Sequence, residues 1–185
     1  MASAFSHALV AVVTGQPFRE QGLGWRELLL GALCSVVPDV DVIGFQFGVA
    51  YGDVWGHRGL THSFLFAALL SGSLVALWYR SRPMAVTTGL FFYFFFCTAS
   101  HGLLDAMTNG GLGVAFFSPF DTTRYFFPFR PILVSPIGVS GFISAYGFHV
   151  LVSEITWIWM PSFAAYTAIR VIQRLWPVRA VGVSS

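Results

Sequence analysis

Histidine and acidic residues are scarce in this chain, and most of them fall into a few short motifs. Of 185 residues, 5 are histidine and 8 are aspartate or glutamate. His101 and Asp105 stand four residues apart in an apolar run, so on a helix both side chains project from one face, one turn apart. Ionisable groups at membrane depth are costly and indicate a functional site. This pair is therefore the first candidate for two ligands of one metal ion, although a simple His–Asp pairing is the alternative.

A second motif, at residues 56–63, reads Gly-His-Arg-Gly-Leu-Thr-His-Ser. It places two imidazoles, His57 and His62, around Arg58 and directly before a long apolar run. A helix N-terminus offers free N–H groups and partial positive charge, which suit anions, and the arginine fork matches phosphate or carboxylate. The motif predicts metal ligands beside an anion-binding arginine. A polar loop at the membrane interface is the alternative.

Two carboxylates, Asp39 and Asp41, follow Pro38 at the end of an uncharged run. Unpaired carboxylates in apolar surroundings are costly, and a bound divalent cation would neutralise them. Solvated acids at a helix end broken by proline are the alternative. His7 lies on a short apolar segment, where a lone histidine is usually a core residue, and it becomes a candidate ligand only because of the other motifs.

Imidazole and carboxylate together, without thiolate, form the ligand set of catalytic zinc, or of manganese or iron. Both cysteines, Cys34 and Cys97, stand in apolar runs, and we expect them to be buried hydrophobic residues. A metal ion of this kind lowers the pKa of a bound water toward about 7 and so supplies a hydroxide nucleophile. The residue types therefore predict hydrolysis.

The composition predicts the membrane as the environment of these motifs. Hydrophobic residues make up 56% of the chain and charged residues 10%, whereas soluble domains carry about 25% charged residues. The mean hydropathy is +0.71. A net charge of +2 is too small to favour nucleic acid as a partner. Residues 1–14 lack the charged start of a cleavable signal peptide.

The apolar segments predict an all-α fold, a polytopic membrane helix bundle with about four to five membrane-embedded helices and a polar metal site near one membrane face. We expect helices at residues 2–13, 25–37, 63–79, 84–107 and 137–176. Pro38 is expected to end the second, Thr61 to cap the third and Pro161 to kink the last. The aromatic stretch 116–136 is expected to be an ordered interfacial loop. Residues 1–176 form one predicted domain, followed by a tail at 177–185.

The arginines predict the topology. If the segments alternate across the membrane, seven of the ten arginines fall at one end: Arg19, Arg26, Arg80, Arg82, Arg170, Arg174 and Arg179. The positive-inside rule makes that end cytoplasmic. The other arginines, Arg58, Arg124 and Arg130, fall at the opposite end with the histidine motifs. We therefore expect a multi-pass protein of the cytoplasmic membrane whose site faces the periplasm.

The motifs around His7, Asp39 and Asp41, residues 56–63, and His101 and Asp105 occur in an order that resembles the YdjM-like family of bacterial membrane-bound metal-dependent hydrolases. The resemblance covers about residues 1–136 and includes Phe129-Arg130-Pro131-Ile132. That family is distantly similar to the all-helical zinc-dependent phospholipase C and single-strand nuclease superfamily. By that similarity, the metal ligands would be His7, Asp39, His57 or His62, His101 and Asp105. The superfamily completes a three-metal site with a His-x-x-x-Glu pair, but His149 and Glu154 are five apart, so we prefer to interpret them as polar anchors in the bundle.

The predicted function is that of a bacterial inner-membrane, metal-dependent hydrolase, a phosphoesterase acting on a lipid or lipid-linked phosphate. One to three divalent ions, zinc or manganese, would be its cofactors, and no nucleic acid would be a partner. The predicted roles are catalysis for Asp39, Asp41 and Arg58, and substrate binding for Arg58, Arg124 and Arg130.

Two alternatives lack turnover: a metal-transport or sensing site, and a scaffold whose ion only joins helices. A relay across the membrane is disfavoured because no acid, arginine or histidine lies between His62 and Arg80 or between Met84 and Ser100. A closed four-ligand site would favour the scaffold.

Overall fold

The structure is a computed structural model that describes residues 1–21 and 23–175. Every regular element in this range is helical, and the β pairing there consists of two isolated bridges, Thr108–Ile132 and Val114–Tyr125. The predicted all-α class is therefore confirmed. The predicted tail at 177–185, with Arg179, lies outside the described residues, as does Trp176.

The first four α-helices are α1 (Ala4–Gly15), α2 (Trp25–Val36), α3 (Phe64–Trp78) and α4 (Met84–Ala106), of which α1 carries His7 and α4 carries His101 and Asp105. Their bounds lie within two residues of the predicted ones. A short 3₁₀ helix, η1 (Gln16–Gln21), follows α1. Two helical stretches, Trp25–Phe47 and Met84–Ala106, are long and apolar enough to cross a membrane, and α3 is a shorter apolar helix. The larger number of membrane-embedded helices stays a prediction.

Pro38 changes the winding of the second helix instead of ending it. The α-helical part stops at Val36, and the chain continues as a 3₁₀ helix, η2 (Val37–Phe47). Proline lacks an N–H but is tolerated in the first turn of a helix, where that donor has no partner. The loop that leads to the motif at residues 56–63 therefore begins only after η2, and Asp39 and Asp41 stand on an ordered element.

Ser63, not the predicted Thr61, caps α3. The Ser63 hydroxyl accepts a hydrogen bond from Phe66 N at 3.1 Å. Thr61 lies two residues earlier, in the 3₁₀ turn η3 (Leu60–His62), and its hydroxyl donates to Asp41 instead. Both residue types suit a cap, so the tertiary contact with Asp41 decides which one serves.

The C-terminal helical run comprises α5 (Val139–Phe142), α6 (Ala145–Glu154), η4 (Ile155–Trp159) and α7 (Met160–Leu175). Near the predicted kink the structure has a π-helical turn, η4, which ends two residues before Pro161. Proline cannot donate to the preceding turn and its ring crowds that turn, and a single π turn relieves such a conflict without breaking the helix.

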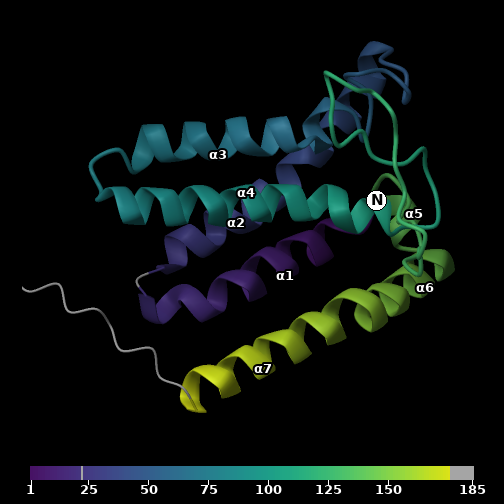
Figure 1. Ribbon diagram of the computed structural model, residues 1–185. Helices are drawn as coiled ribbons and strands as arrows, with labels where there is room; N and C mark the ends of the chain where they lie inside the picture. The colour runs from purple at the N-terminus through teal and green to yellow at the C-terminus, as the bar shows by residue number, and fades with distance from the viewer. Residues whose placement is uncertain (22, 176–185) are drawn as a thin grey trace, which may run out of the picture.

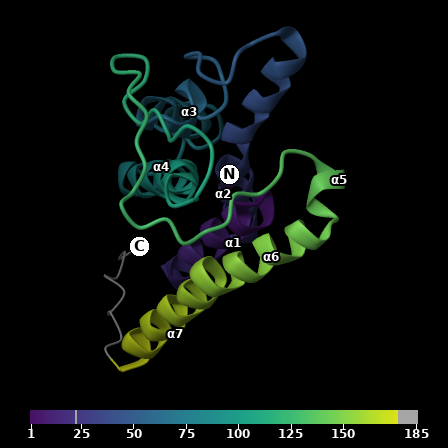
Figure 2. The ribbon, with the colours of Figure 1, turned by 90° about the vertical axis from the view of Figure 1, so that its right-hand side faces the viewer.

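The helices converge at one end of the molecule (Figure 1), where the N-terminus lies beside the C-terminal end of α4. Viewed from this end (Figure 2), α1 lies between α4 and the run from α6 to α7. Toward the opposite end, the Arg26 guanidinium lies 5.6 Å from the Tyr79 ring, and Gln173 of α7 donates to Pro17 O. These contacts agree with the predicted grouping of arginines at one end. Which side of the membrane that end faces stays a prediction.

The core between α1, α2, α3 and α4 is apolar. It is formed by Ala11, Cys34, Leu74, Tyr79, Leu90, Phe94 and Cys97. Both cysteines are buried and free, as predicted. The polar motifs are thus confined to the end of the bundle where the loops lie.

Candidate metal centre

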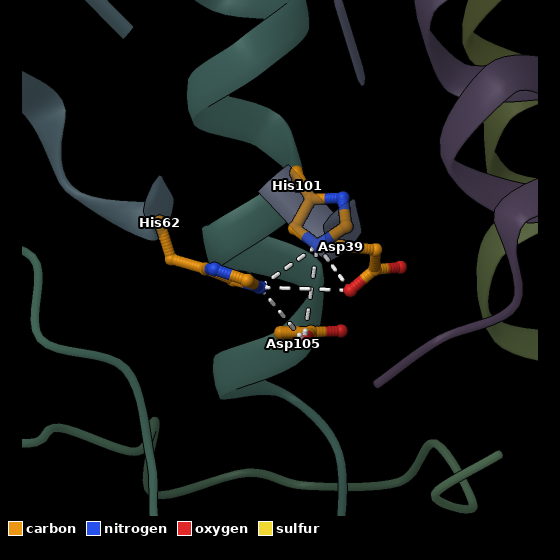
Figure 3. Close-up of side chains that lie close together, drawn as sticks. All are labelled: Asp39, His62, His101 and Asp105. Atoms are coloured by element: carbon orange, nitrogen blue, oxygen red, sulfur yellow. Dashed lines mark hydrogen bonds and ion pairs between the residues drawn. The ribbon is translucent and has the colours of Figure 1, made fainter. Parts of the chain in front are cut away.

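Four predicted ligands meet at the converging ends of the helices (Figure 3). Asp39 comes from η2, His62 from η3, and His101 and Asp105 from α4, and one donor atom of each lies within 4.8 Å of the others. His101 Nε2 is 3.0 Å from His62 Nε2 and 3.2 Å from Asp39 Oδ1. His62 Nε2 is 3.7 Å from Asp105 Oδ2. We refer to these four residues as the cluster.

The orientation of His101 is set by a backbone carbonyl. Its Nδ1 lies 2.7 Å from Ser35 O. A carbonyl oxygen only accepts, so Nδ1 carries the hydrogen and Nε2 directs its lone pair into the cluster. Ser35 stands in the last turn of α2, where carbonyls have no partner within the helix. The end of α2 before Pro38 thereby frees the group that orients His101.

His62 is oriented in the same sense by a carboxylate. Its Nδ1 lies 3.2 Å from Asp41 Oδ2 and 3.0 Å from the Thr61 hydroxyl. That hydroxyl donates to Asp41 at 2.6 Å, so it can only accept from His62. His62 Nδ1 therefore carries the hydrogen, and its Nε2 also faces the cluster.

Two imidazole lone pairs that face each other at 3.0 Å require a cation between them, either a metal ion or a proton. Burial disfavours the charged form of His62, but the neighbouring carboxylates of Asp39, 3.7 Å from Nε2, and Asp41, 3.2 Å from Nδ1, outweigh burial and raise the pKa of His62 to about 9. Without a metal ion, a proton thus takes this place. Carboxylate–imidazole donors and a fixed Nδ1 partner are also the usual arrangement around a protein-bound divalent metal.

Unpaired polar atoms at this place fit a divalent cation. Both Asp39 oxygens, Asp105 Oδ2 and both His7 nitrogens are buried without a hydrogen bond among the described residues. Buried polar groups rarely lack a partner, and an ion is one explanation. Of the carboxylates of Asp39, Asp41 and Asp105, that of Asp105 pairs with the Arg58 guanidinium, and the other two have no arginine partner among the described residues, which leaves two negative side-chain charges. A divalent ion would neutralise both.

Asp41 stands behind the cluster. Its Oδ1 lies 2.7 Å from His57 Nδ1, and its Oδ2 accepts from Arg58 N at 3.2 Å and from the Thr61 hydroxyl. Its carboxylate is therefore occupied by the loop at residues 57–62, which it holds in place. Asp41, His57 and His62 also form a second group close enough to hold an ion, so the predicted ligand role of His57 and catalytic role of Asp41 stay predictions.

Arg58 is fully buried, and its guanidinium contacts Asp105 and the turn at residues 108–110. Its Nε lies 3.0 Å from Asp105 Oδ2, while Nη1 donates to Gly110 O and Nη2 to the Thr108 hydroxyl, both at 2.9 Å. Its φ of 65° is uncommon for a residue with a side chain and is held by these contacts. The arrangement favours positioning of Asp105. The predicted contact of Arg58 with a substrate phosphate stays a prediction.

Arg124 and Arg130, the other two arginines predicted to bind a substrate phosphate, do not contact the cluster. Arg124 belongs to the aromatic stretch 116–136, which we call the aromatic loop. Its guanidinium donates to the backbone carbonyls of Tyr51, Asp53 and His57 and so links the loop at residues 51–57 to the aromatic loop. Arg130 is exposed, and its guanidinium lies 4.6 Å from the centre of the Phe126 ring. Their substrate-binding roles stay predictions.

His7 joins the edge of the cluster. Its ring is stacked on that of His101, with centroids 3.7 Å apart, and its Nε2 is 3.5 Å from Asp105 Oδ1. Burial lowers the pKa of His7 to about 4, so the ring is neutral. The Ala2 amide donates to the same Asp105 oxygen at 2.7 Å. Sequence reasoning missed Ala2, as it missed Ser35, because both act through backbone groups.

The pair His149 and Glu154 does not converge on the cluster. His149 is exposed, whereas Glu154 is buried and accepts hydrogen bonds from Ser3 and Ser6. This placement agrees with the interpretation of Glu154 as a polar anchor between helices, but not with that of His149, whose side chain is exposed.

Comparisons with known proteins point to one family. The profile of the family described as YdjM inner membrane protein matches residues 1–177. The inner membrane protein YbcI of Escherichia coli (strain K12) is 38% identical over 167 residues, which cover 87% of this chain and 92% of that protein. No solved structure gives a significant match.

Proposed function

The chain belongs to the YdjM inner membrane protein family, and on that premise we propose that it is a membrane-bound hydrolase dependent on a divalent metal ion. One observation carries the proposal: two imidazole Nε2 atoms face each other at 3.0 Å beside buried carboxylate oxygens without hydrogen bonds. Zinc, or manganese, suits these donors.

In this proposal, different residues would bind the ion and accept a proton. Asp39, His62, His101 and Asp105 would hold the ion. When bound, such an ion lowers the pKa of water toward about 7 and polarises a phosphoryl oxygen. Asp41 accepts from His57 Nδ1, which leaves His57 Nε2 as the nitrogen able to receive a proton, beside the rings of Phe45 and Tyr51.

The proposed substrate is a phosphoester of a lipid or a lipid-linked molecule. Large aromatic side chains are exposed on the elements around the cluster, among them Phe47, Trp55 and Phe120. Aromatic residues are enriched at membrane–water interfaces, so a site among them would meet the headgroup region. The grouping of arginines at the other end supports a periplasmic position for this site.

A second candidate function is a structural ion that joins the ends of the helices. It is favoured by the burial of the cluster, because none of the four side chains is more than 10% exposed. A site of that kind keeps its ion and has no turnover. Measuring ion content and hydrolysis on the same preparation separates the two functions.

The test uses purified wild type beside Asp105→Asn and Asp105→Ala, with Asp121→Asn as the control because Asp121 is exposed on the aromatic loop and bonds only there. We expect about one or more equivalents of zinc or manganese in the wild type and the control. Both Asp105 variants should lose the ion. Phosphate should be released from phospholipids or polyprenyl phosphates only by the proteins that hold the ion. Wild type without metal after chelator-free purification would contradict the proposal. Wild type with metal but no hydrolysis would favour the structural ion.

A further inference from the structure

Glu154 is a fully buried acid outside the cluster, at the last residue of α6. Its Oε1 accepts from Ser3 N at 2.5 Å, and its Oε2 accepts from the hydroxyls of Ser3 at 2.5 Å and Ser6 at 2.7 Å. No arginine or histidine in the described chain forms an ion pair with it. The hydrogen bonds of its carboxylate are all directed at the first turn of one helix, α1.

The direction of each hydrogen bond in this group follows from the donors. The Trp159 indole donates from Nε1 to the Ser6 hydroxyl at 2.8 Å, and an indole N–H cannot accept. The Ser6 hydroxyl therefore donates its own hydrogen to Glu154. The Ser3 hydroxyl accepts from Ser6 N as the cap of α1 and donates to Glu154. A carboxylate at a helix N-terminus also interacts favourably with the helix dipole.

The π-helical turn η4 is what allows two side chains of one helix to reach Ser6. Glu154 and Trp159 are five residues apart, which on an α-helix would place them about 140° apart around the axis. Ile155–Trp159 form the π-helical turn, whose hydrogen bonds join residues five apart. This wider turn brings Glu154 and Trp159 toward the same face, the one that meets α1.

The same N-terminal turn of α1 supports the cluster from its other side. Ala2 N donates to Asp105 Oδ1 at 2.7 Å, and His7 lies against Asp105 and His101. Glu154 itself has no hydrogen bond to the cluster. The start of α1 is therefore the element that connects the buried acid to two of the candidate ligands.

We propose that Glu154 is a positioning residue of the metal centre: it clamps the N-terminus of α1 so that Ala2 and His7 hold Asp105 and His101 in the geometry that binds the ion. This inference rests on the metal-dependent function proposed above. A purely structural anchor would change the stability of the folded protein and leave its affinity for metal unchanged.

The test compares Glu154→Gln and Glu154→Ala with His149→Ala, an exposed control on the same helix. Zinc affinity of the folded, detergent-purified protein is measured by titration, and amide hydrogen exchange is followed over the first two turns of α1. Outer residues that orient ligands typically change metal affinity by about 10- to 100-fold, so we expect a loss of that size in Glu154→Ala, with faster exchange. Glu154→Gln should be intermediate because its amide oxygen still accepts from Ser3 N, and His149→Ala should match wild type.

Ser6→Ala provides a milder variant if Glu154→Ala does not fold, because it removes one hydroxyl from Glu154 and the partner of Trp159. Faster exchange with wild-type zinc affinity in these variants would overturn the positioning role while leaving the metal-dependent function intact. Unchanged exchange would overturn the clamp itself. Wild type that binds no zinc would reject the metal-dependent function, and the positioning role with it.

Discussion

Asp41→Asn separates the orientation of the ligands from ligation itself. Asn and Asp have nearly the same shape, and Asp41 serves the cluster from behind through His57, Thr61 and His62. The Arg58 backbone N–H points at Oδ2 and can only donate. The asparagine oxygen is therefore expected to occupy that side, and its NH₂ group would face His57 Nδ1.

Two consequences follow for the imidazoles. His57 Nδ1 must then accept a hydrogen bond, so its hydrogen moves to Nε2 and the nitrogen proposed to receive a proton becomes a donor. His62 Nδ1 exchanges a charged acceptor for a neutral one. The stabilising free energy of that hydrogen bond falls from about 1.5–3 to about 0.5–1.5 kcal/mol. The difference of about 1–1.5 kcal/mol corresponds to roughly tenfold in affinity, at the lower end of the 10- to 100-fold typical for such partners.

The assay is zinc titration together with hydrolysis measured at saturating zinc. We expect Asp41→Asn to bind zinc about tenfold more weakly and to remain inactive even when zinc is saturating. Asp53→Asn is the matched control, because Asp53 lies on the adjoining loop and, among the described residues, its side chain accepts only from Ala50 N at the exposed surface. Wild-type zinc affinity in Asp41→Asn would refute the orienting role, and full activity at saturating zinc would refute the role of His57.

Other perturbations test the remaining parts of the arrangement. Arg58→Lys should weaken zinc binding about tenfold. The lysine ammonium can pair with Asp105, but unlike the guanidinium it cannot at the same time donate hydrogen bonds to Thr108 and Gly110. A raised KM with unchanged zinc affinity would instead assign Arg58 to substrate binding. Zinc binding between about pH 7 and 9 should release about one proton, since the ion displaces the proton that the raised pKa of His62, about 9, retains. Affinity should therefore rise with pH up to about 9, and calorimetry in buffers of different ionisation enthalpy that detected no proton release would contradict this. A periplasm-dependent phosphatase reporter fused after Arg82 should be inactive, and an active fusion would place the cluster on the cytoplasmic side.

The cluster could be predicted from the sequence because its residue types are rare in this chain. Once the helix at residues 84–107 is recognised, the four-residue spacing places His101 and Asp105 on the same face. A carboxylate such as Asp39 at the end of an uncharged stretch requires a partner. Four of the predicted ligands indeed lie together in the structure. The long apolar helices were predictable for the same reason: their composition leaves few alternatives.

The groups that orient the ligands could not be predicted, because most of them belong to the backbone. Every residue carries the same N–H and C=O, so nothing in the sequence distinguishes Ser35 O or Ala2 N from its neighbours. The use of Ser63 as the cap of α3 depends on the tertiary contacts between Thr61 and Asp41. Local propensity alone does not contain them.

The orienting contacts also bear on whether an ion here would be resident or transported. His101 is held by a carbonyl, His62 by Asp41, and Asp105 by Arg58 and Ala2 N, and none of these contacts requires an ion. The donors are therefore arranged in advance, and binding would replace one proton without moving a helix. Such preorganisation raises affinity and slows release. A carrier needs the opposite, so the geometry favours a resident ion over a cargo ion.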